Sequence, residues 1–261
     1  KKFNPKNKYL QSPQWQENDT LKQPDLANTL QIIRDNGRDG FYEGEIAQSI
    51  VETMSPNGLI SMSDLKNYTA IWREPVTLNF QNHKLISMPP PSSGGIALSQ
   101  LMMMVFSFDL ANIKHNSLEY VHLLSEIEKR VYADRAMYLG DIDYYNVPIQ
   151  KLLESDYNQH RANEIDLKKA TPSDSLSYGK FNFNESEETT HFSIIDYFGN
   201  AVSLTTTLNT SYGSKLFVEN RGFLLNNEMD DFSSKPGVPN TYGLLGSKAN
   251  AIEPGKRMLS S

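Results

Sequence analysis

The fold class of this chain is decided by the stretch from Glu188 to Thr207, which reads ETTHFSIIDYFGNAVSLTTT. Aromatic and β-branched residues fill its two halves, and Gly199-Asn200 separates them. This pattern predicts two β-strands, Thr190–Ile195 and Ala201–Thr207, joined by a tight turn. The predicted hairpin therefore carries threonines at the start of its first strand and at the end of its second strand. An acidic segment directly precedes the first strand.

The sequence before this stretch has mainly helical patterns, and the sequence after it has strand and loop patterns. We expect helices at residues 25–37, 40–54, 63–68, 96–108, 117–138 and 156–163. We expect further strands at residues 75–80, 83–88, 217–218 and 222–225. The core-facing residues expected in the helix at 117–138 are Val121, Leu124, Ile127 and Val131. A helix-rich half followed by a strand-rich half predicts an α+β fold rather than a regular βαβ alternation.

Residues 171–188 differ in composition from the sequence on either side, because Ser, Asn and Glu dominate them. Such a segment buries little apolar area, so we expect a mobile or solvent-exposed linker. This linker ends on Glu188, immediately before the predicted hairpin.

Composition excludes several classes of protein. The 25 basic and 31 acidic residues give a net charge of −6, which argues against a nucleic-acid partner. No run approaches the ~20 apolar residues of a transmembrane helix, so no membrane span is expected. The absence of cysteine removes disulfides, thiolate metal sites and a cysteine nucleophile. The motifs G-x-S-x-G and H-E-x-x-H are also missing, and we expect neither a cofactor nor a metal.

The cluster Asn226–Asp231 contains three carboxylates, at Glu228, Asp230 and Asp231. Three interpretations of this cluster are open. The first is a solvated loop with Asx turns. The second is a Ca²⁺ or Mg²⁺ site, although the ligand spacing of an EF-hand is absent. The third is binding of a ligand ammonium group by Asp231.

The threonines of the hairpin allow two interpretations. The simpler one is that threonine suits a half-buried strand. The other is that cleavage of the backbone at Glu188–Thr189 makes Thr189 an N-terminal nucleophile. Its free α-amine, with a pKa of about 7.7–8.0, would then act as the base for its own hydroxyl. Such chemistry needs no histidine, cysteine or metal.

Several motifs resemble those of γ-glutamyltransferases, also called glutathione hydrolases, and they occur in the same order along the chain. The hairpin resembles the start of that family's small subunit, as do residues 207–210, 224–232, 235–240, 249–251 and 256–261. Residues 36–42, 89–95, 132–135 and 138–141 resemble blocks of its large subunit. The chain is thus identified as a member of this family of N-terminal-nucleophile (Ntn) hydrolases.

The resemblance implies an αββα sandwich, in which two stacked sheets lie between helical layers, and of which this chain holds a part because both ends look truncated. It implies a precursor that cleaves itself between Glu188 and Thr189. Residues 1–188 would then end the large subunit and residues 189–261 would begin the small subunit, and together they would form one αββα domain. The block 89–95 and the pair Asp134-Arg135 are expected to be structural.

The resemblance also implies roles for single residues. Thr189 would attack the carbonyl of a γ-glutamyl amide, and Thr207 would assist through a hydrogen bond to its hydroxyl. The residues implied for the substrate's α-ammonium group are Asn209, Glu228 and Asp231. The residues implied for its α-carboxylate are Ser260 and Ser261. Tyr242 matches the position of a lid tyrosine.

The implied activity is hydrolysis or transfer of the γ-glutamyl group of glutathione and related compounds, with water, amino acids or dipeptides as acceptors. The family's carboxylate-binding arginine would lie upstream of Lys1 and its Gly-Gly oxyanion hole downstream of Ser261, so we expect this piece alone to be inactive. The alternatives are a cephalosporin-acylase-like relative and an inactive scaffold, and the retained Thr189, Thr207 and Asp231 disfavour the scaffold. The family further implies a periplasmic or secreted location.

Overall fold

The computed structural model describes residue 4 and residues 16–176, 189–233 and 246–260. The chain forms two compact units. One unit comprises Lys1–Ile71 and Ser186–Glu228, and the other comprises Trp72–Glu185 and Met229–Ser261. The predicted subunit boundary after residue 188 concerns the cleavage of one bond, which these units do not test, and it stays a prediction.

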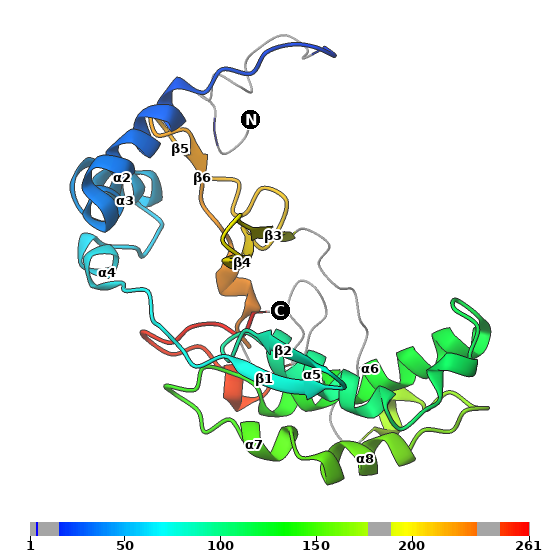
Figure 1. Ribbon diagram of the computed structural model, residues 1–261. Coiled ribbons are helices and arrows are strands. Elements are labelled where there is room, and N and C mark those ends of the chain that lie inside the picture. The colour runs from blue at the N-terminus through cyan, green and yellow to red at the C-terminus, as the bar shows by residue number, and fades with distance from the viewer. Residues whose placement is uncertain (1–3, 5–15, 177–188, 234–245, 261) are drawn as a thin grey trace. The chain divides into compact units, whose positions relative to one another are not determined.

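The first unit joins helices from the start of the chain to strands from much later in it (Figure 1). Its helices are α2 (Pro24–Tyr42), α3 (Gly44–Met54) and α4 (Met62–Asn67). Its strands are β3 (Thr189–Ile195), β4 (Ala201–Thr207), β5 (Phe217–Val218) and β6 (Phe223–Leu224). Both pairs, β3–β4 and β5–β6, are antiparallel. Ile46, Ile50 and Val218 form the buried core between α3 and the strand pair β5–β6.

Glycine and serine set the helix ends in this unit. Gly37 takes φ +59° and ψ −137°, which breaks α2 where the sequence predicted its end, but the chain continues helically to Tyr42. The predicted start of the next helix at residue 40 was wrong, because the second left-handed glycine, Gly44, begins α3. The sequence Ser63-Asp64 predicts a cap at residue 63, and this prediction was also wrong. Ser61 caps this helix through a reciprocal pair of hydrogen bonds with Asp64.

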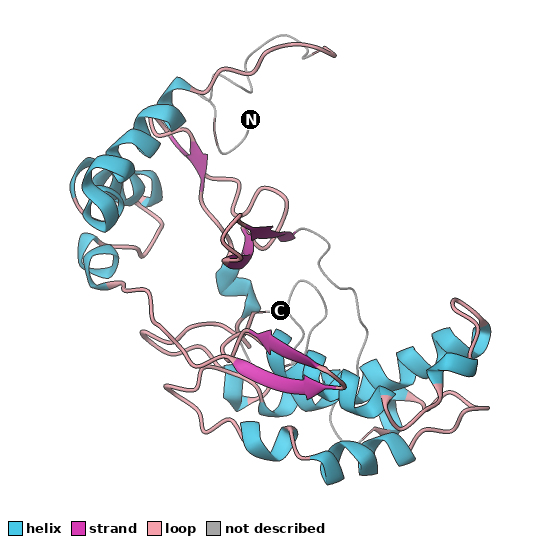
Figure 2. Cartoon of the chain, in the orientation of Figure 1, coloured by secondary structure: helices cyan, strands magenta, loops and turns pink. Residues whose placement is uncertain are grey.

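The second unit contains a hairpin and a group of packed helices (Figure 2). The antiparallel hairpin consists of β1 (Val76–Phe80) and β2 (His83–Ser87) and lies against α5 (Gly94–Val105). The other α-helices are α6 (Leu118–Tyr138), α7 (Ile149–Leu152) and α8 (Ser155–Asn163). The 3₁₀ turns are η1 (Leu110–Asn112), η2 (Ser173–Ser175) and η4 (Lys248–Asn250), and η3 (Glu228–Asp231) begins at the last residue of the first unit.

Two apolar clusters stabilise the second unit. The first surrounds Ile96 and includes Leu139 and Leu259, and the second surrounds Met104. In α6 the buried apolar stripe consists of Leu123, Ile127 and Val131, which are spaced four residues apart. The expectation that Val121 faces this core was wrong, since its side chain is 52% exposed.

The predicted linker at 171–188 is anchored where the structure describes it. The Thr171 N–H donates to Glu126 Oε1 on α6 at 3.0 Å, and Leu176 is buried. Residues 177–188 lie outside the described part of the chain.

Glu126 holds a buried charge cluster on α6. Its carboxylate accepts from Lys129 Nζ at 2.7 Å, from Arg130 Nη1 at 2.9 Å and from the Thr171 N–H. Burial alone would raise the pKa of this carboxyl, but the hydrogen bonds from Lys129, Thr171 and Arg130 outweigh it and lower the pKa to about 2.

We therefore expect Glu126 to contribute stability that is fully present above pH ~4.5 and is lost as the pH falls toward ~2, because protonation favours the unfolded state in that window. The Glu126→Gln variant should be less stable at neutral pH, and its stability should vary less between pH 4.5 and 2. Thermal unfolding across this range measures both effects. Glu154→Gln, which removes a half-exposed partner of Lys151, is the control. Parallel pH curves for wild type and Glu126→Gln would contradict the assignment.

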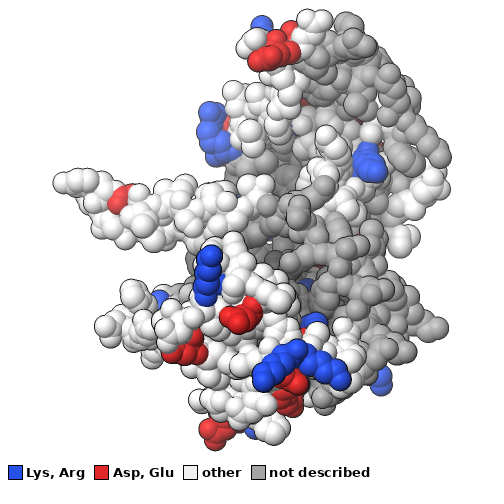
Figure 3. All heavy atoms as spheres, turned by 90° about the vertical axis from the view of Figure 1, so that its right-hand side faces the viewer, with Lys and Arg blue, Asp and Glu red and all other residues white. Residues whose placement is uncertain are grey.

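Surface charge and helix hydropathy bear on two of the expectations drawn from the composition. Figure 3 shows one face on which the basic and acidic side chains of the described residues lie interspersed, rather than gathered into a stripe of one sign. None of the described helices is both long and apolar enough to cross a membrane. The absence of a nucleic-acid partner stays a prediction.

Candidate active site

The hairpin β3–β4 places the two predicted catalytic threonines opposite each other. Its register pairs Thr189 with Thr207, followed by Thr190 with Thr206 and His191 with Thr205. Residues directly opposite in an antiparallel pair have Cα atoms about 4.5–5.5 Å apart. The first residue of β3 and the last residue of β4 therefore meet at the open end of the hairpin.

The chain after β4 turns sharply and ties this end to the Asn226–Asp231 cluster. The Asn209 N–H donates to the Thr207 hydroxyl oxygen at 2.9 Å, and Asn209 takes the left-handed φ of +75° that asparagine tolerates. Asn209 is buried, and its side-chain Nδ2 donates to the Asn227 carbonyl at 3.1 Å. In return the Asn227 N–H donates to the Leu208 carbonyl at 3.2 Å. Thr207, Asn209 and the residue before Glu228 thus form one connected group.

The Asn226–Asp231 cluster has the Asx-turn chemistry that the first interpretation predicted. Asn226 Oδ1 accepts from the Glu228 N–H at 3.1 Å, and residues Glu228–Asp231 then form the single 3₁₀ turn η3. No group of three or more His, Asp or Glu side chains is placed to hold a metal ion within the part of the chain that the structure describes. The Asx turn explains the backbone conformation of this cluster. The binding of an ammonium group by Asp231 stays a prediction.

A second group of predicted site residues lies in the second unit. Asn250 connects Asp231 to the segment that carries Ser260. Its Nδ2 donates to the Asp231 carbonyl at 2.7 Å, and its Oδ1 accepts from the Leu259 N–H at 2.8 Å. The Ser233 N–H donates to the Asn250 carbonyl at 2.9 Å.

The block at residues 89–95 also holds Ser260, through backbone hydrogen bonds. The Ser260 N–H donates to the Pro91 carbonyl at 3.0 Å, and the Ser93 N–H donates to the Ser260 carbonyl at 2.7 Å. Arg135 Nε donates to the Ser93 hydroxyl at 3.0 Å, which fixes this turn to α6. A Cβ at Gly95 would overlap the Met88 carbonyl oxygen, so only glycine fits there. The block thus supports a predicted substrate-binding residue, and its purely structural role stays a prediction.

The predicted site residues therefore fall into two groups. Thr189, Thr207, Asn209 and Glu228 belong to the first unit, and Asp231 and Ser260 belong to the second. Glu188, Tyr242 and Ser261 lie outside the described residues. Sequence reasoning missed Asn250 and Ser93, although both lie in motifs that carried the family resemblance.

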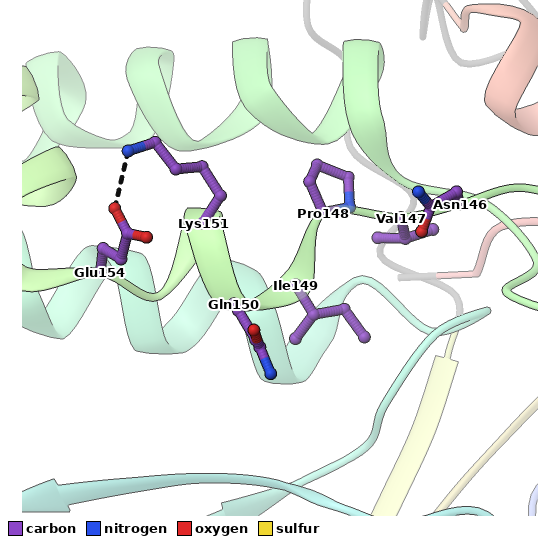
Figure 4. Close-up of a pocket in the computed structure, with 7 residues that line it drawn as sticks. All are labelled: Asn146, Val147, Pro148, Ile149, Gln150, Lys151 and Glu154. Atoms are coloured by element: carbon purple, nitrogen blue, oxygen red, sulfur yellow. Dashed lines mark hydrogen bonds and ion pairs between the residues drawn. The ribbon is translucent and has the colours of Figure 1, made fainter.

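A surface pocket in the second unit lies apart from these residues in the sequence. Asn146–Lys151 and Glu154 line it around α7, and none of them is a predicted site residue. Its one ion pair joins Lys151 Nζ and Glu154 Oε2 at 2.6 Å (Figure 4). Lys151 lies on α7 and Glu154 follows the end of that helix, and an ion pair between two such exposed side chains is typical of a solvated surface.

The described helices and antiparallel hairpins form an α+β fold, and the solved structures that it matches place the chain in the class of Ntn hydrolases. The predicted α+β fold of this class is confirmed. A family model described as Gamma-glutamyltranspeptidase matches residues 3–261. The chain belongs to the γ-glutamyltranspeptidase family.

Individual relatives agree with this assignment. A glutathione hydrolase proenzyme of Pseudomonas aeruginosa is 51% identical over 242 residues, which cover 92% of this chain and 43% of that protein. The structure of a γ-glutamyltranspeptidase from Pseudomonas nitroreducens matches with 44% identity and a TM-score of 0.58, over 60% of this chain and 48% of that one. A cephalosporin acylase from Bacillus halodurans shares the fold, with a TM-score of 0.72 at 22% identity over 92% of this chain and 40% of that one. The chain spans less than half the length of these proteins.

Proposed function

We propose that this chain carries the nucleophile and the amino-acid-binding residues of an enzyme that cleaves the γ-glutamyl amide of glutathione and related compounds. The observation that carries the proposal is the register of Thr189 opposite Thr207 at the open end of β3–β4, in a chain that matches the γ-glutamyltranspeptidase family from residue 3 to residue 261. The glutathione hydrolase relative, at 51% identity, supports the substrate class.

The proposed reaction begins with a free α-amine on Thr189. This amine takes the proton of the Thr189 hydroxyl, whose oxygen attacks the γ-glutamyl carbonyl. The C–N bond then breaks, an ester with Thr189 forms, and the α-ammonium group passes its proton to the leaving amine. Water then hydrolyses the ester, or an amino acid or dipeptide accepts the glutamyl group. The Thr207 hydroxyl oxygen accepts from the Asn209 N–H, and a hydroxyl that accepts can also donate its own proton to another acceptor. In this proposal that acceptor is the Thr189 hydroxyl.

The α-amino-acid end of the substrate is bound by charge and hydrogen bonds in this proposal. Asn209, Glu228 and Asp231 bind the α-ammonium group, and charge-assisted hydrogen bonds of this kind are about twice as strong as neutral ones. Ser260 and Ser261 bind the α-carboxylate, and Tyr242 covers the substrate. The connection from Asn209 through the Asn227 carbonyl to the residue before Glu228 supports a shared role for these side chains.

Maturation completes the proposal. The Glu188–Thr189 bond is cleaved by the protein itself, which separates a large subunit from a small subunit that begins at Thr189. The word proenzyme in the name of the P. aeruginosa relative supports this step. The mature enzyme lies in the periplasm or outside the cell.

A pair of chromogenic substrates tests the function. The full-length gene product should release the aniline from a γ-glutamyl anilide and should act at least roughly 10-fold more slowly on the matching glutaryl anilide, which lacks only the α-amine. The reason is that Asp231 and Glu228 gain a charged partner only from the γ-glutamyl compound. Equal rates with the two anilides would contradict amino-acid recognition and favour the acylase alternative, and no release from either would contradict both.

A further inference from the structure

Asn250 is a buried asparagine whose side-chain amide forms hydrogen bonds through both its nitrogen and its oxygen. It is 4% exposed, and its Nδ2 and Oδ1 bond to the Asp231 carbonyl and to the Leu259 N–H. The first partner belongs to a residue that we propose for the α-ammonium group. The second partner immediately precedes Ser260, which we propose for the α-carboxylate. One amide group therefore joins the two backbone segments that carry these side chains.

The segment around Asn250 is fixed to the rest of the second unit. The Ser247 hydroxyl donates to the Met137 carbonyl at 2.8 Å and the Ser247 N–H donates to the Ala136 carbonyl at 3.2 Å, both at the end of α6. A Cβ at Gly140 would overlap the Ala249 carbonyl oxygen, so the chain can approach there only because residue 140 is glycine. The segment that carries Asn250 is thus held against the end of α6 by hydrogen bonds and close packing.

Asparagine suits this position for a chemical reason. Its short side chain presents one donor and one acceptor on the same carbon, and here each meets a backbone group of the opposite kind. Aspartate keeps the acceptor for the Leu259 N–H but replaces the donor to the Asp231 carbonyl with a negatively charged oxygen. An amino acid's ammonium and carboxylate groups are attached to the same carbon, so the groups that bind them must keep a fixed spacing. Misplacement by about 0.5 Å is enough to weaken such a constellation.

We propose that Asn250 is a positioning residue that sets the spacing between the α-ammonium and α-carboxylate binding segments and thereby selects α-amino-acid substrates. This inference rests on the proposed function, and it assigns Asn250 no contact with the substrate. A change at Asn250 is therefore expected to affect KM and the preference for γ-glutamyl substrates more than it affects kcat.

The test compares two buried asparagines of the second unit in the full-length gene product. Asn158 is the matched control, because it is fully buried and its Nδ2 donates to the carbonyls of Leu152 and Glu154, but it contacts no predicted site residue. We expect Asn250→Asp to raise KM for the γ-glutamyl anilide roughly 10-fold or more, with kcat changed less than about 3-fold. Its preference for the γ-glutamyl over the glutaryl anilide should fall. Asn158→Asp should lower the Tm and leave both KM and the preference unchanged.

The outcomes separate this inference from the function on which it rests. A wild-type enzyme without γ-glutamyl activity overturns the proposed function and this inference with it. An active wild type with an unchanged KM in Asn250→Asp, or an equal rise in both variants, overturns the positioning role alone. If Asn250→Asp does not fold, Asn250→Ser, which carries one small hydroxyl and no charge, is measured in its place against Asn158→Ser under the same criteria.

Discussion

A Thr189→Ala variant of the full-length gene product is expected to lose at least about 10³-fold of its γ-glutamyl hydrolase activity. Alanine has no hydroxyl, so no ester with the glutamyl group can form. The same change removes the group that would attack the Glu188 carbonyl during self-cleavage. The variant is therefore also expected to remain a single polypeptide, with the Glu188–Thr189 bond intact.

Two measurements check this prediction together. Release of the chromophore from the γ-glutamyl anilide gives the activity, and mass spectrometry of the purified protein gives one polypeptide or two. Thr189→Ser keeps a hydroxyl and should retain measurable cleavage and activity. Thr190→Ala is the matched control, because residue 190 is the next position of β3 and pairs with Thr206 rather than Thr207. It should keep activity within a few-fold of wild type.

The prediction fails in two recognisable ways. Turnover by Thr189→Ala at the wild-type rate would remove residue 189 as the nucleophile. A two-chain product from this variant would place the cleaved bond elsewhere or make a different residue responsible for cleavage. Loss of activity in Thr190→Ala to the same extent as in Thr189→Ala would show that the strand, and not one hydroxyl, is what the changes disturb.

Local patterns predicted the elements of the fold because local chemistry decides them. Both long hairpins, β1–β2 and β3–β4, form where alternating β-formers flank short turns. The break at Gly37 lies where Asn36-Gly37 predicted a helix end. The errors have a different origin. The exposed Val121 and the buried Leu123 have similar propensities, and only the packing of α6 against its neighbours separates them.

The candidate site could be predicted as a set of residue types but not as a set of contacts. The threonines and the carboxylate cluster were identified from motifs, but the register that pairs Thr189 with Thr207 is seen only in the structure. The support of Ser260 by Pro91 and Ser93 joins residues about 170 positions apart, and no local pattern encodes such a pairing. The role of Asn250 could not be predicted from the sequence either, because the Asp231 carbonyl and the Leu259 N–H become its partners only after folding.

A buried charge network in the second unit leads to the prediction with the largest effect on stability. Arg161 on α8 is 5% exposed and Asp134 on α6 is fully buried, and Arg161 Nη2 lies 3.2 Å from Asp134 Oδ1. The other carboxylate oxygen, Oδ2, accepts from Gln100 Nε2 and from the Tyr157 hydroxyl, both at 2.9 Å. Burial raises the pKa of Asp134 in spite of the opposing charge of Arg161. Arg161 thus lowers the cost of keeping this carboxylate ionised.

We expect Arg161→Met to destabilise the protein by about 3–5 kcal/mol, because it leaves the Asp134 charge buried without its cation. Arg34→Met is the matched control, since Arg34 and its partner Asp35 are both mostly exposed and such surface pairs contribute little to stability. Calorimetric unfolding of the two variants measures the difference. The loss in Arg161→Met should shrink as the pH falls, because Asp134 can then take up a proton in the folded state.

A second substitution shows whether the stranded charge is the cause. Adding Asp134→Asn to Arg161→Met removes that charge and keeps an oxygen that can accept from Gln100 or Tyr157, so part of the lost stability should return. In the wild-type background Asp134→Asn should be destabilising, because Arg161 then loses its buried anion and keeps only Glu164 as a carboxylate partner among the described residues. Two substitutions that are harmful singly and compensate each other in combination are the signature of a coupled pair. Strictly additive losses, or a loss in Arg161→Met no larger than that in Arg34→Met, would mean that the packing of α6 and α8 holds without this ion pair.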